Sequence, residues 1–217
     1  MKGDRMKTTV LSVRILANAD RSLLERLEVP ADHRSLGFIT TDCDDVGYAA
    51  LDEATKKAEV TVAYARSMYA GASNASTALA GEFIGILSGP DPEEVKSGIE
   101  AFVSYVENDA AFYSANDDDS IVYFAHCISR TGSYLSKAAE VPEGTAMAYL
   151  IAPPLEAMMG IDAALKAAGD EMRVFYGPPS ETNFAGALLT GEQSACVSAC
   201  EAFAEMVCAI AEAPLKY

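Results

Sequence analysis

The sequence predicts an α/β protein made of two tandem copies of one domain. Residues 36–58 (LGFITTDCDDVGYAALDEATKKA) have the pattern of a strand, an acidic turn and an amphipathic helix. Residues 147–169 (MAYLIAPPLEAMMGIDAALKAAG) repeat that order. Matching residues keep a nearly constant spacing, which indicates an internal repeat. The pairs 112 residues apart are Val10/Val122, Glu28/Glu140 and Ile39/Ile151, and Asp52/Asp162 are 110 apart. We therefore expect one domain at 1–108 and a second at 109–217.

The first copy is predicted from local patterns. Alternating β-branched residues indicate strands at 8–16, 36–41, 60–66 and 82–87. A short helix over 21–27 follows Asp20, a good N-cap residue, and ends before Pro30. In the next helix Val46, Ala50, Leu51, Ala54 and Ala58 form one apolar face, and we expect the i,i+4 pair Asp52–Lys56 on the opposite face. The last helix of this copy is expected over 93–106, with five apolar residues on one face.

The second copy is predicted in the same order. Strands are expected at 121–128, 148–152, 171–176 and 184–189. A short helix is expected over 133–139, a second one up to Gly169, whose glycine suits a helix C-terminus, and a last one over 194–211. The spacing of the repeat falls to about 101 in its last part, because the first copy has the longer loop at 67–80.

Composition limits the possible functions. The 217 residues include 32 acidic and 16 basic ones, which gives a net charge of −16 and argues against nucleic-acid partners and anionic membranes. The polar N-terminal stretch has no signal-peptide pattern and no apolar run suggests a membrane span, so we expect a cytoplasmic protein.

Neither an enzyme site nor a metal site is expected. Only two histidines occur, and neither a GxGxxG nor a P-loop spacing is present. Cys196, Cys200 and Cys208 share one helical face and are interpreted as buried apolar residues. His126 and Cys127 are adjacent in a strand, so they should point to opposite faces.

The motifs together resemble a known family, the bacterial microcompartment (BMC) shell domain. The resemblance rests on RSLGFITTDCDDV, DEATKKA, RSMYAGA, SRTGSYLS, AYLIAPPLEA, GIDAALK and PPSETNF, which together extend over nearly the whole chain. Each copy has its first strand and short helix before the core unit, which is similar to the circularly permuted branch of the family. The chain is most similar to tandem-domain shell proteins of the ethanolamine-utilisation compartment.

The resemblance implies fold, assembly and function. Each domain should be a small sheet flanked by helices, in the ferredoxin-like class of α+β sandwiches. Three chains should form a homotrimeric, pseudohexameric tile that packs with neighbouring shell proteins. The tile should control the passage of small molecules through a gated central pore and acidic small pores. No catalytic cofactor is implied, although ethanolamine or cobalamin is a possible ligand. The alternative is a soluble ligand-binding or sensor protein with a duplicated α/β fold.

Seven residues are candidates for the small pore. Asp44 and Asp45 precede a helix, where one acid suits capping. Together with Asp42 they repel one another, which favours attraction of a cation. Glu156 takes the corresponding turn in the second copy, and Glu181, Thr182 and Asn183 offer polar groups suited to an amino alcohol. Phe112 suits either the core or a wall that faces a ligand, and it forms a candidate cobalamin site with residues 180–184.

The loop at 67–80 (SMYAGASNASTALA) is either a plain surface loop or the gate of the central pore. Its small residues have little packing to lose, so two loop conformations can lie close in free energy. The candidate gate residues are Met68, Tyr69, Gly71, Ser73 and Asn74.

Overall fold

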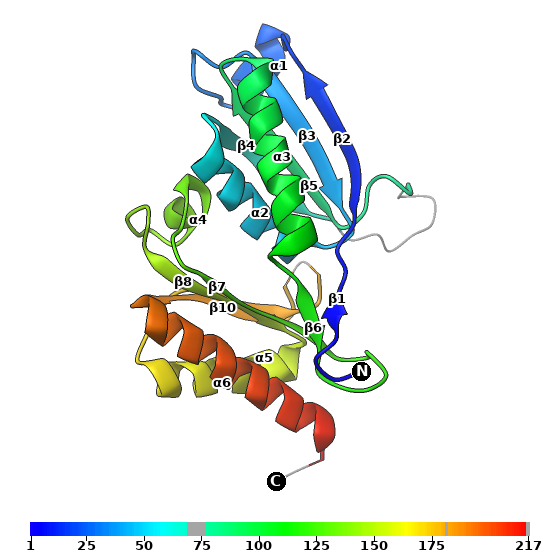
Figure 1. Ribbon diagram of the computed structural model, residues 1–217, viewed down its shortest axis with the longest axis vertical. Helices are drawn as coiled ribbons and strands as arrows, with labels where there is room; N and C mark the ends of the chain where they lie inside the picture. The colour runs from blue at the N-terminus through cyan, green and yellow to red at the C-terminus, as the bar shows by residue number, and fades with distance from the viewer. Residues whose placement is uncertain (69–76, 181, 216–217) are drawn as a thin grey trace. The chain divides into compact units, whose positions relative to one another are not determined.

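The structure, a computed structural model, describes residues 1–68, 77–180 and 182–215, and the chain divides into two compact units (Figure 1). The N-terminal unit contains Thr8–Ala110 together with Gly132–Leu135. The C-terminal unit contains Met1–Lys7, Ala111–Thr131 and Ser136–Tyr217. The sequence repeat places 1–7 in the first domain and 132–135 in the second, so each of these short segments lies outside the unit to which the repeat assigns it.

The N-terminal unit is a four-stranded antiparallel sheet with two helices on one face. The sheet order is β2 (Val10–Leu16), β3 (Ser35–Thr41), β5 (Phe83–Gly89) and β4 (Thr61–Ser67). The helices are α2 (Asp44–Lys57) and α3 (Pro92–Asn108) (Figure 1). Glycine allows both to approach closely: a Cβ on Gly37 would lie 2.7 Å from Val95 of α3, and one on Gly85 3.0 Å from Leu51 of α2.

The other face of this sheet carries a smaller apolar cluster. Ala19, Leu36 and Ile86 are buried there. Leu24 from α1 (Arg21–Arg26) and Leu27 pack against them. The Asp20 side chain accepts a hydrogen bond from the Ser22 N–H (2.8 Å), which confirms Asp20 as the N-cap of α1.

The C-terminal unit is a six-stranded sheet that is also covered by two helices. Its order is β1 (Arg5–Met6), β6 (Phe112–Ser114), β7 (Val122–Ile128), β8 (Ala146–Ala152), β10 (Ala185–Gly191) and β9 (Glu171–Tyr176). The helices α5 (Pro154–Ala168) and α6 (Gln193–Glu212) lie on one face (Figure 1). Leu150 and Leu189 of the sheet form the core with Ile161 and Phe203 of the helices. The short helix α4 (Ser133–Ala138) begins in the segment that belongs to the N-terminal unit.

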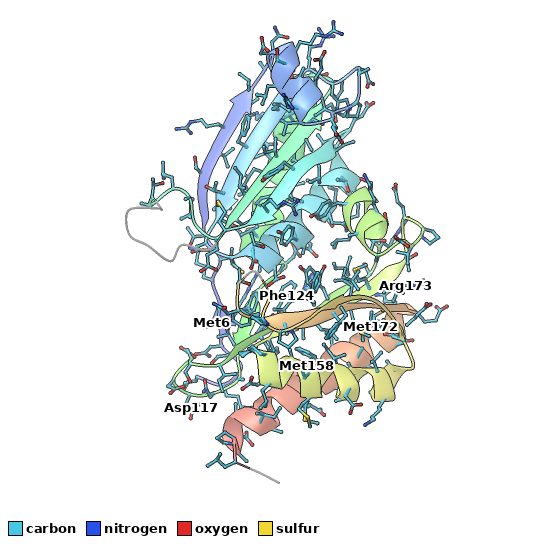
Figure 2. All side chains as sticks on the ribbon, turned by 180° about the vertical axis from the view of Figure 1, so that it is seen from behind. Met6, Asp117, Phe124, Met158, Met172 and Arg173 are labelled. Atoms are coloured by element: carbon cyan, nitrogen blue, oxygen red, sulfur yellow. The ribbon has the colours of Figure 1, made fainter. Side chains whose placement is uncertain are left out.

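The opposite face of this sheet is lined with aromatic rings (Figure 2). Phe124 is fully buried, stacks on His126 and meets the edge of Tyr149, with ring centroids 5.3 Å apart in both pairs. Cys127 packs on the helix-covered face. His126 and Cys127 therefore point to opposite faces, as expected from the alternation of the strand.

The predicted strands and helices all occur, with bounds that differ by one or two residues in most cases. Strands β1 and β6 were not predicted, because two and three residues are too short to show a periodic pattern. Gly169 ends α5 in the left-handed conformation (φ 67°), as predicted. Helix α6 extends one residue beyond the predicted range 194–211 at each end, and within the described part of the chain it alone is long and apolar enough to cross a membrane. Phe203 and Val207 of α6 are fully buried and belong to the hydrophobic core, so this helix packs one face on its own sheet.

The expected i,i+4 pair Asp52–Lys56 is present, but the Asp52 side chain does not face the solvent. The Asp52 side chain is fully buried and accepts hydrogen bonds from the N–H groups of Gly132 (2.7 Å) and Leu135 (2.8 Å). The Lys56 Nζ lies 3.7 Å from Asp52 Oδ2. Burial raises the pKa of Asp52, and the two N–H groups and Lys56 only partly offset this effect. The covering segment 132–135 is remote in sequence, so the local helical pattern did not reveal it.

Candidate functional site

The candidate site is the acidic turn between β3 and α2. Asp42 directly follows the last residue of β3. Cys43 is the N-cap residue of α2, and Asp44 and Asp45 lie in the first turn of that helix. Both of these aspartates are only 7% exposed. The Cys43 side chain makes no capping hydrogen bond, so negative charge in the first turn is what complements the helix dipole.

A chain of side-chain hydrogen bonds fixes Asp44. Its Oδ2 accepts from the Ser67 hydroxyl (2.7 Å), and its Oδ1 accepts from the Asp45 N–H (2.9 Å). The Tyr48 hydroxyl lies 2.9 Å from Ser67 Oγ. Ser67 has a single hydroxyl proton, which goes to the carboxylate, so Tyr48 donates to Ser67. The last residue of β4 and the second turn of α2 therefore hold Asp44 in one position.

The neighbouring acids raise the negative charge of this turn. Asp42 Oδ1 accepts from the Thr9 N–H (2.7 Å), which ties the turn to the chain before β2. The pKa of Glu82 is raised, first by loss of hydration and then by the charges of Asp44 and Asp42. Burial, with a contribution from Asp45, also raises the pKa of the Cys43 thiol, which is therefore not a reactive thiolate at neutral pH. The turn suits a cation better than it suits nucleophilic chemistry.

The remaining small-pore candidates lie in the C-terminal unit. Glu156 is partly exposed in the first turn of α5. Thr182 and Asn183 precede β10, where Asn183 has the left-handed conformation (φ 66°). Glu181 lies outside the described residues. Asp44 and Asp45 belong to the N-terminal unit, so these candidates fall into two separate sets.

Phe112 has the surroundings of a core residue. It is 8% exposed, stacks on Phe124 at 5.3 Å and meets the edge of the Phe184 ring at 6.0 Å. The contact with Phe184 places it beside the loop with which the sequence grouped it.

Of the candidate gate residues, only Met68 is described. Its N–H donates to the Glu82 carbonyl (2.7 Å), which joins the two ends of the intervening segment. Tyr69, Gly71, Ser73 and Asn74 lie outside the described residues.

The cysteines behave as core residues. Cys196, Cys200 and Cys208 are buried, as predicted, and burial raises the pKa of Cys196 to about 12. All five thiols are free. Across residues 1–68, 77–180 and 182–215, no three His, Cys, Asp or Glu side chains are grouped so that they could hold a metal ion.

Sequence reasoning missed Ser67, Tyr48 and Glu82 as parts of the acidic turn. Tyr48 follows Asp44 by four residues on α2, a spacing that could have indicated a shared helix face. Ser67 and Glu82 reach the turn through the pairing of β4, β5 and β3, which no local pattern reveals.

Comparisons with known proteins give one consistent result. The BMC domain family matches residues 35–116. The microcompartment shell protein EutL of Clostridium perfringens is 62% identical over 217 residues, all of both chains. EutL of Escherichia coli is 48% identical over 98% of this chain and 97% of its own. The crystal structure of the ethanolamine utilization protein EutL of Leptotrichia buccalis matches all of both chains with a TM-score of 0.97 and 65% identity. These relatives are structural shell proteins and not enzymes, and the chain belongs to the EutL family of bacterial microcompartment shell proteins.

Proposed function

We propose that the chain is a trimeric tile in the shell of an ethanolamine-utilisation microcompartment in the cytoplasm, where it packs beside other shell proteins and regulates the passage of small molecules. Identity of 62–65% to EutL proteins over the full chain supports this role. Two tandem domains per chain suit a ring of six domains built from three chains. The alternative function is that of a soluble sensor protein with the same fold.

The acidic turn is the part of the tile that we propose to bind a small cation, namely protonated ethanolamine. The observation that carries this proposal is that Asp44 and Asp45, adjacent carboxylates, are both held almost completely buried. Burial lowers the screening of their charge, so an ammonium group should be attracted more strongly there than at an exposed acid. Glu156, Glu181, Thr182 and Asn183 remain proposed partners for the same ligand.

The test is calorimetric titration of ethanolamine into the wild-type chain and into Asp44→Asn/Asp45→Asn. We expect the double variant to bind at least about tenfold more weakly, and this difference should shrink as salt increases. The matched control is Asp117→Asn/Asp118→Asn, which removes the same net charge from an exposed loop. Equal binding by the wild type and the acidic-turn variant would leave these aspartates with a purely structural role.

We also propose that the segment 67–80 controls a central channel. Ser67 and Met68 at its start are tied to Asp44 and Glu82, so the acidic turn and the segment share hydrogen bonds. A ligand at the turn can shift this segment only if it binds two conformations with different affinity. Cysteines placed within the segment in neighbouring subunits should crosslink differently with and without ethanolamine, and equal crosslinking would argue against coupling.

Cobalamin is a weaker candidate ligand. The aromatic pair Phe112–Phe184 offers an apolar contact beside the polar residues Thr182 and Asn183. Addition of cobalamin should shift its visible spectrum or the melting temperature of the chain, and Phe184→Ala should reduce the shift. A spectrum that does not change would exclude this ligand.

Electron microscopy of the concentrated chain distinguishes the tile from the sensor. Extended flat arrays are expected for a shell protein, together with a trimeric mass in light scattering. Discrete monomers that bind a ligand tightly would favour the sensor.

A further inference from the structure

Three cysteines and one aspartate lie together where helix α6 packs on the sheet of the C-terminal unit. Cys196 and Cys200 are one turn apart on α6 and belong to the hydrophobic core. Cys127 of β7 packs against the same core from the helix-covered face of the sheet. Asp170 directly precedes β9, and its carboxylate lies over Gly191 at the end of β10, where an added Cβ would collide with Asp170 Oδ1. We call these three thiols and the carboxylate the thiol cluster.

The first repeat has only hydrocarbon at the four positions of the thiol cluster. The repeat spacings of 112, 110 and 101 align Cys127 with Ile15, Asp170 with Val60, and Cys196 and Cys200 with Val95 and Ile99. The glycines that end β5 and β10 have equivalent surroundings. A Cβ on Gly89 would meet Val95 at 3.0 Å and Val60 at 3.4 Å, as one on Gly191 would meet Asp170. The fold itself therefore does not require three thiols and a carboxylate here.

The carboxylate of the thiol cluster is only half matched by donors. The Cys196 thiol donates a hydrogen bond to the Asp170 side chain. Asp170 Oδ2 is buried and has no hydrogen-bond partner within the part of the chain that the structure describes. A buried carboxylate oxygen without a donor is unfavourable. This oxygen can therefore accept a proton that is released beside it.

Cys127 and Cys200 are the two thiols of the cluster that are placed to act together. Burial raises the pKa of Cys200, and among the neighbouring groups Cys127 contributes most to this rise. Cys196 is instead engaged with Asp170. Cys127 is half-buried, so an ion can reach the pair from the surface. The strand and the helix thus each supply one thiol, and the two thiols face one another across the layer contact.

We propose that Cys127 and Cys200 together bind one copper(I) ion at the contact between β7 and α6. Thiolates are preferred ligands of copper(I), and a metal ion deprotonates the thiols that it binds. As the two S–Cu bonds form, both thiol protons leave, one to water and one to Oδ2 of Asp170. Zinc usually takes four ligands. Within residues 1–68, 77–180 and 182–215 no three His, Cys, Asp or Glu side chains are grouped to hold a metal, which favours an ion that is satisfied by two thiolates.

The first test is anaerobic titration of copper(I) into the reduced chain, measured by the ultraviolet absorption of Cu–thiolate bonds and by competition with a chromogenic copper(I) chelator. We expect one ion per chain. Cys127→Val and Cys200→Val introduce apolar residues, as in the first repeat, and should each weaken binding about 100-fold or more, because the second ligand is lost. The matched control is Cys208→Val, a buried cysteine farther along α6, which should bind as the wild type does.

Two results would overturn the proposed site. One is a wild-type chain that binds copper(I) no more tightly than the two valine variants, with thermal unfolding showing that all the chains are folded. The other is a tight zinc complex that is lost in Cys200→Val, which would overturn the assignment of the ion. The site lies within one unit of a single chain, so neither result depends on assembly of the tile.

The second test counts protons in order to examine the role of Asp170. Metal binding to thiols releases protons, and we expect about one per copper(I) ion from the wild type and about two from Asp170→Asn, measured with a pH indicator in weak buffer. Asp170→Asn should also lower the copper(I) affinity about 10–100-fold, as is usual for groups that support metal ligands. Release of two protons by both chains would overturn Asp170 as the proton acceptor.

Discussion

Helices α2 and α5 descend from one repeated pattern but lie in different environments. Nine residues of α2 are buried, among them the acids Asp44, Asp45 and Asp52, whereas α5 buries only Ala157, Gly160, Ile161 and Ala164. The inner stripe that packs on the sheet is common to both. The difference lies on the outer face, which the segment 132–135 covers on α2. A helical pattern thus determines which face packs on its own sheet, while remote segments determine whether the other face is buried.

The largest expected effect separates Asp52 from Asp162. Asp52→Ala should lower the free energy of unfolding by about 2–4 kcal/mol, because two buried N–H groups lose their acceptor. Asp162→Ala should change it by less than about 0.5 kcal/mol, as expected for an exposed ion pair. Urea unfolding of both variants at the same protein concentration would measure these losses. Equal losses would contradict the distinction between the two helices.

A second prediction concerns the close approach at Gly132. A Cβ there would lie 2.5 Å from the Asp52 carbonyl oxygen, so Gly132→Ala should destabilise the chain by about 1–3 kcal/mol. Gly177→Ala is the control, because its Cβ would meet Phe175 at an ordinary 3.4 Å. Thermal unfolding of both variants would measure this. If Gly132→Ala were as stable as the control, residues 132–135 would not be packed tightly on α2.

A smaller effect is expected at Tyr48. Tyr48→Phe keeps the ring on Tyr134 but removes the hydroxyl that donates to Ser67, which should cost about 1 kcal/mol. The counterpart change Met158→Leu should be nearly neutral in the single chain. Urea unfolding compares the two. A neutral Tyr48→Phe would mean that the hydrogen-bond chain to Asp44 contributes little to stability.

The smallest effect is a dependence on pH at the acidic turn. The corresponding turn before α5 contains Pro153 and Pro154, and Glu156 is the acid in the first turn of that helix. The pKa of Glu82 is raised above 4.5, so its contribution to stability is present below pH 4.5 and is lost as pH rises through the folded-state pKa. Ethanolamine binding should change in the opposite sense and weaken as falling pH protonates Glu82. In Glu82→Gln the pH dependence of stability and that of ethanolamine binding should both be smaller. Unfolding experiments at several pH values would measure the first, and calorimetry would measure the second.

Much of the fold could be predicted because it is local and repeated. Alternation located the strands, and the spacing between repeats aligned Asp52 with Asp162. The site was predicted only in part: the carboxylates Asp44 and Asp45 stand out in the sequence, but Ser67 and Glu82 reach them through strand pairing. The burial of Asp52 depends on residues 80 positions away, and no local rule provides such a contact. Strand β1 pairs with β6, which also pairs with β7, so both short strands depend on partners that are distant in sequence or too short to show a pattern.

The placement of two short segments has a consequence for synthesis on the ribosome. Arg5 and Met6 pair with Tyr113 and Phe112, so β1 must wait for a partner made more than a hundred residues later. The N-terminal unit in turn lacks residues 132–135 until these have left the exit tunnel. Domains commonly fold in the order in which they are made. While only the first half of the chain has been made, the Asp52 carboxylate, which is buried in the folded protein, stays uncovered. The N-terminal unit reaches its final state only when translation has entered the second half.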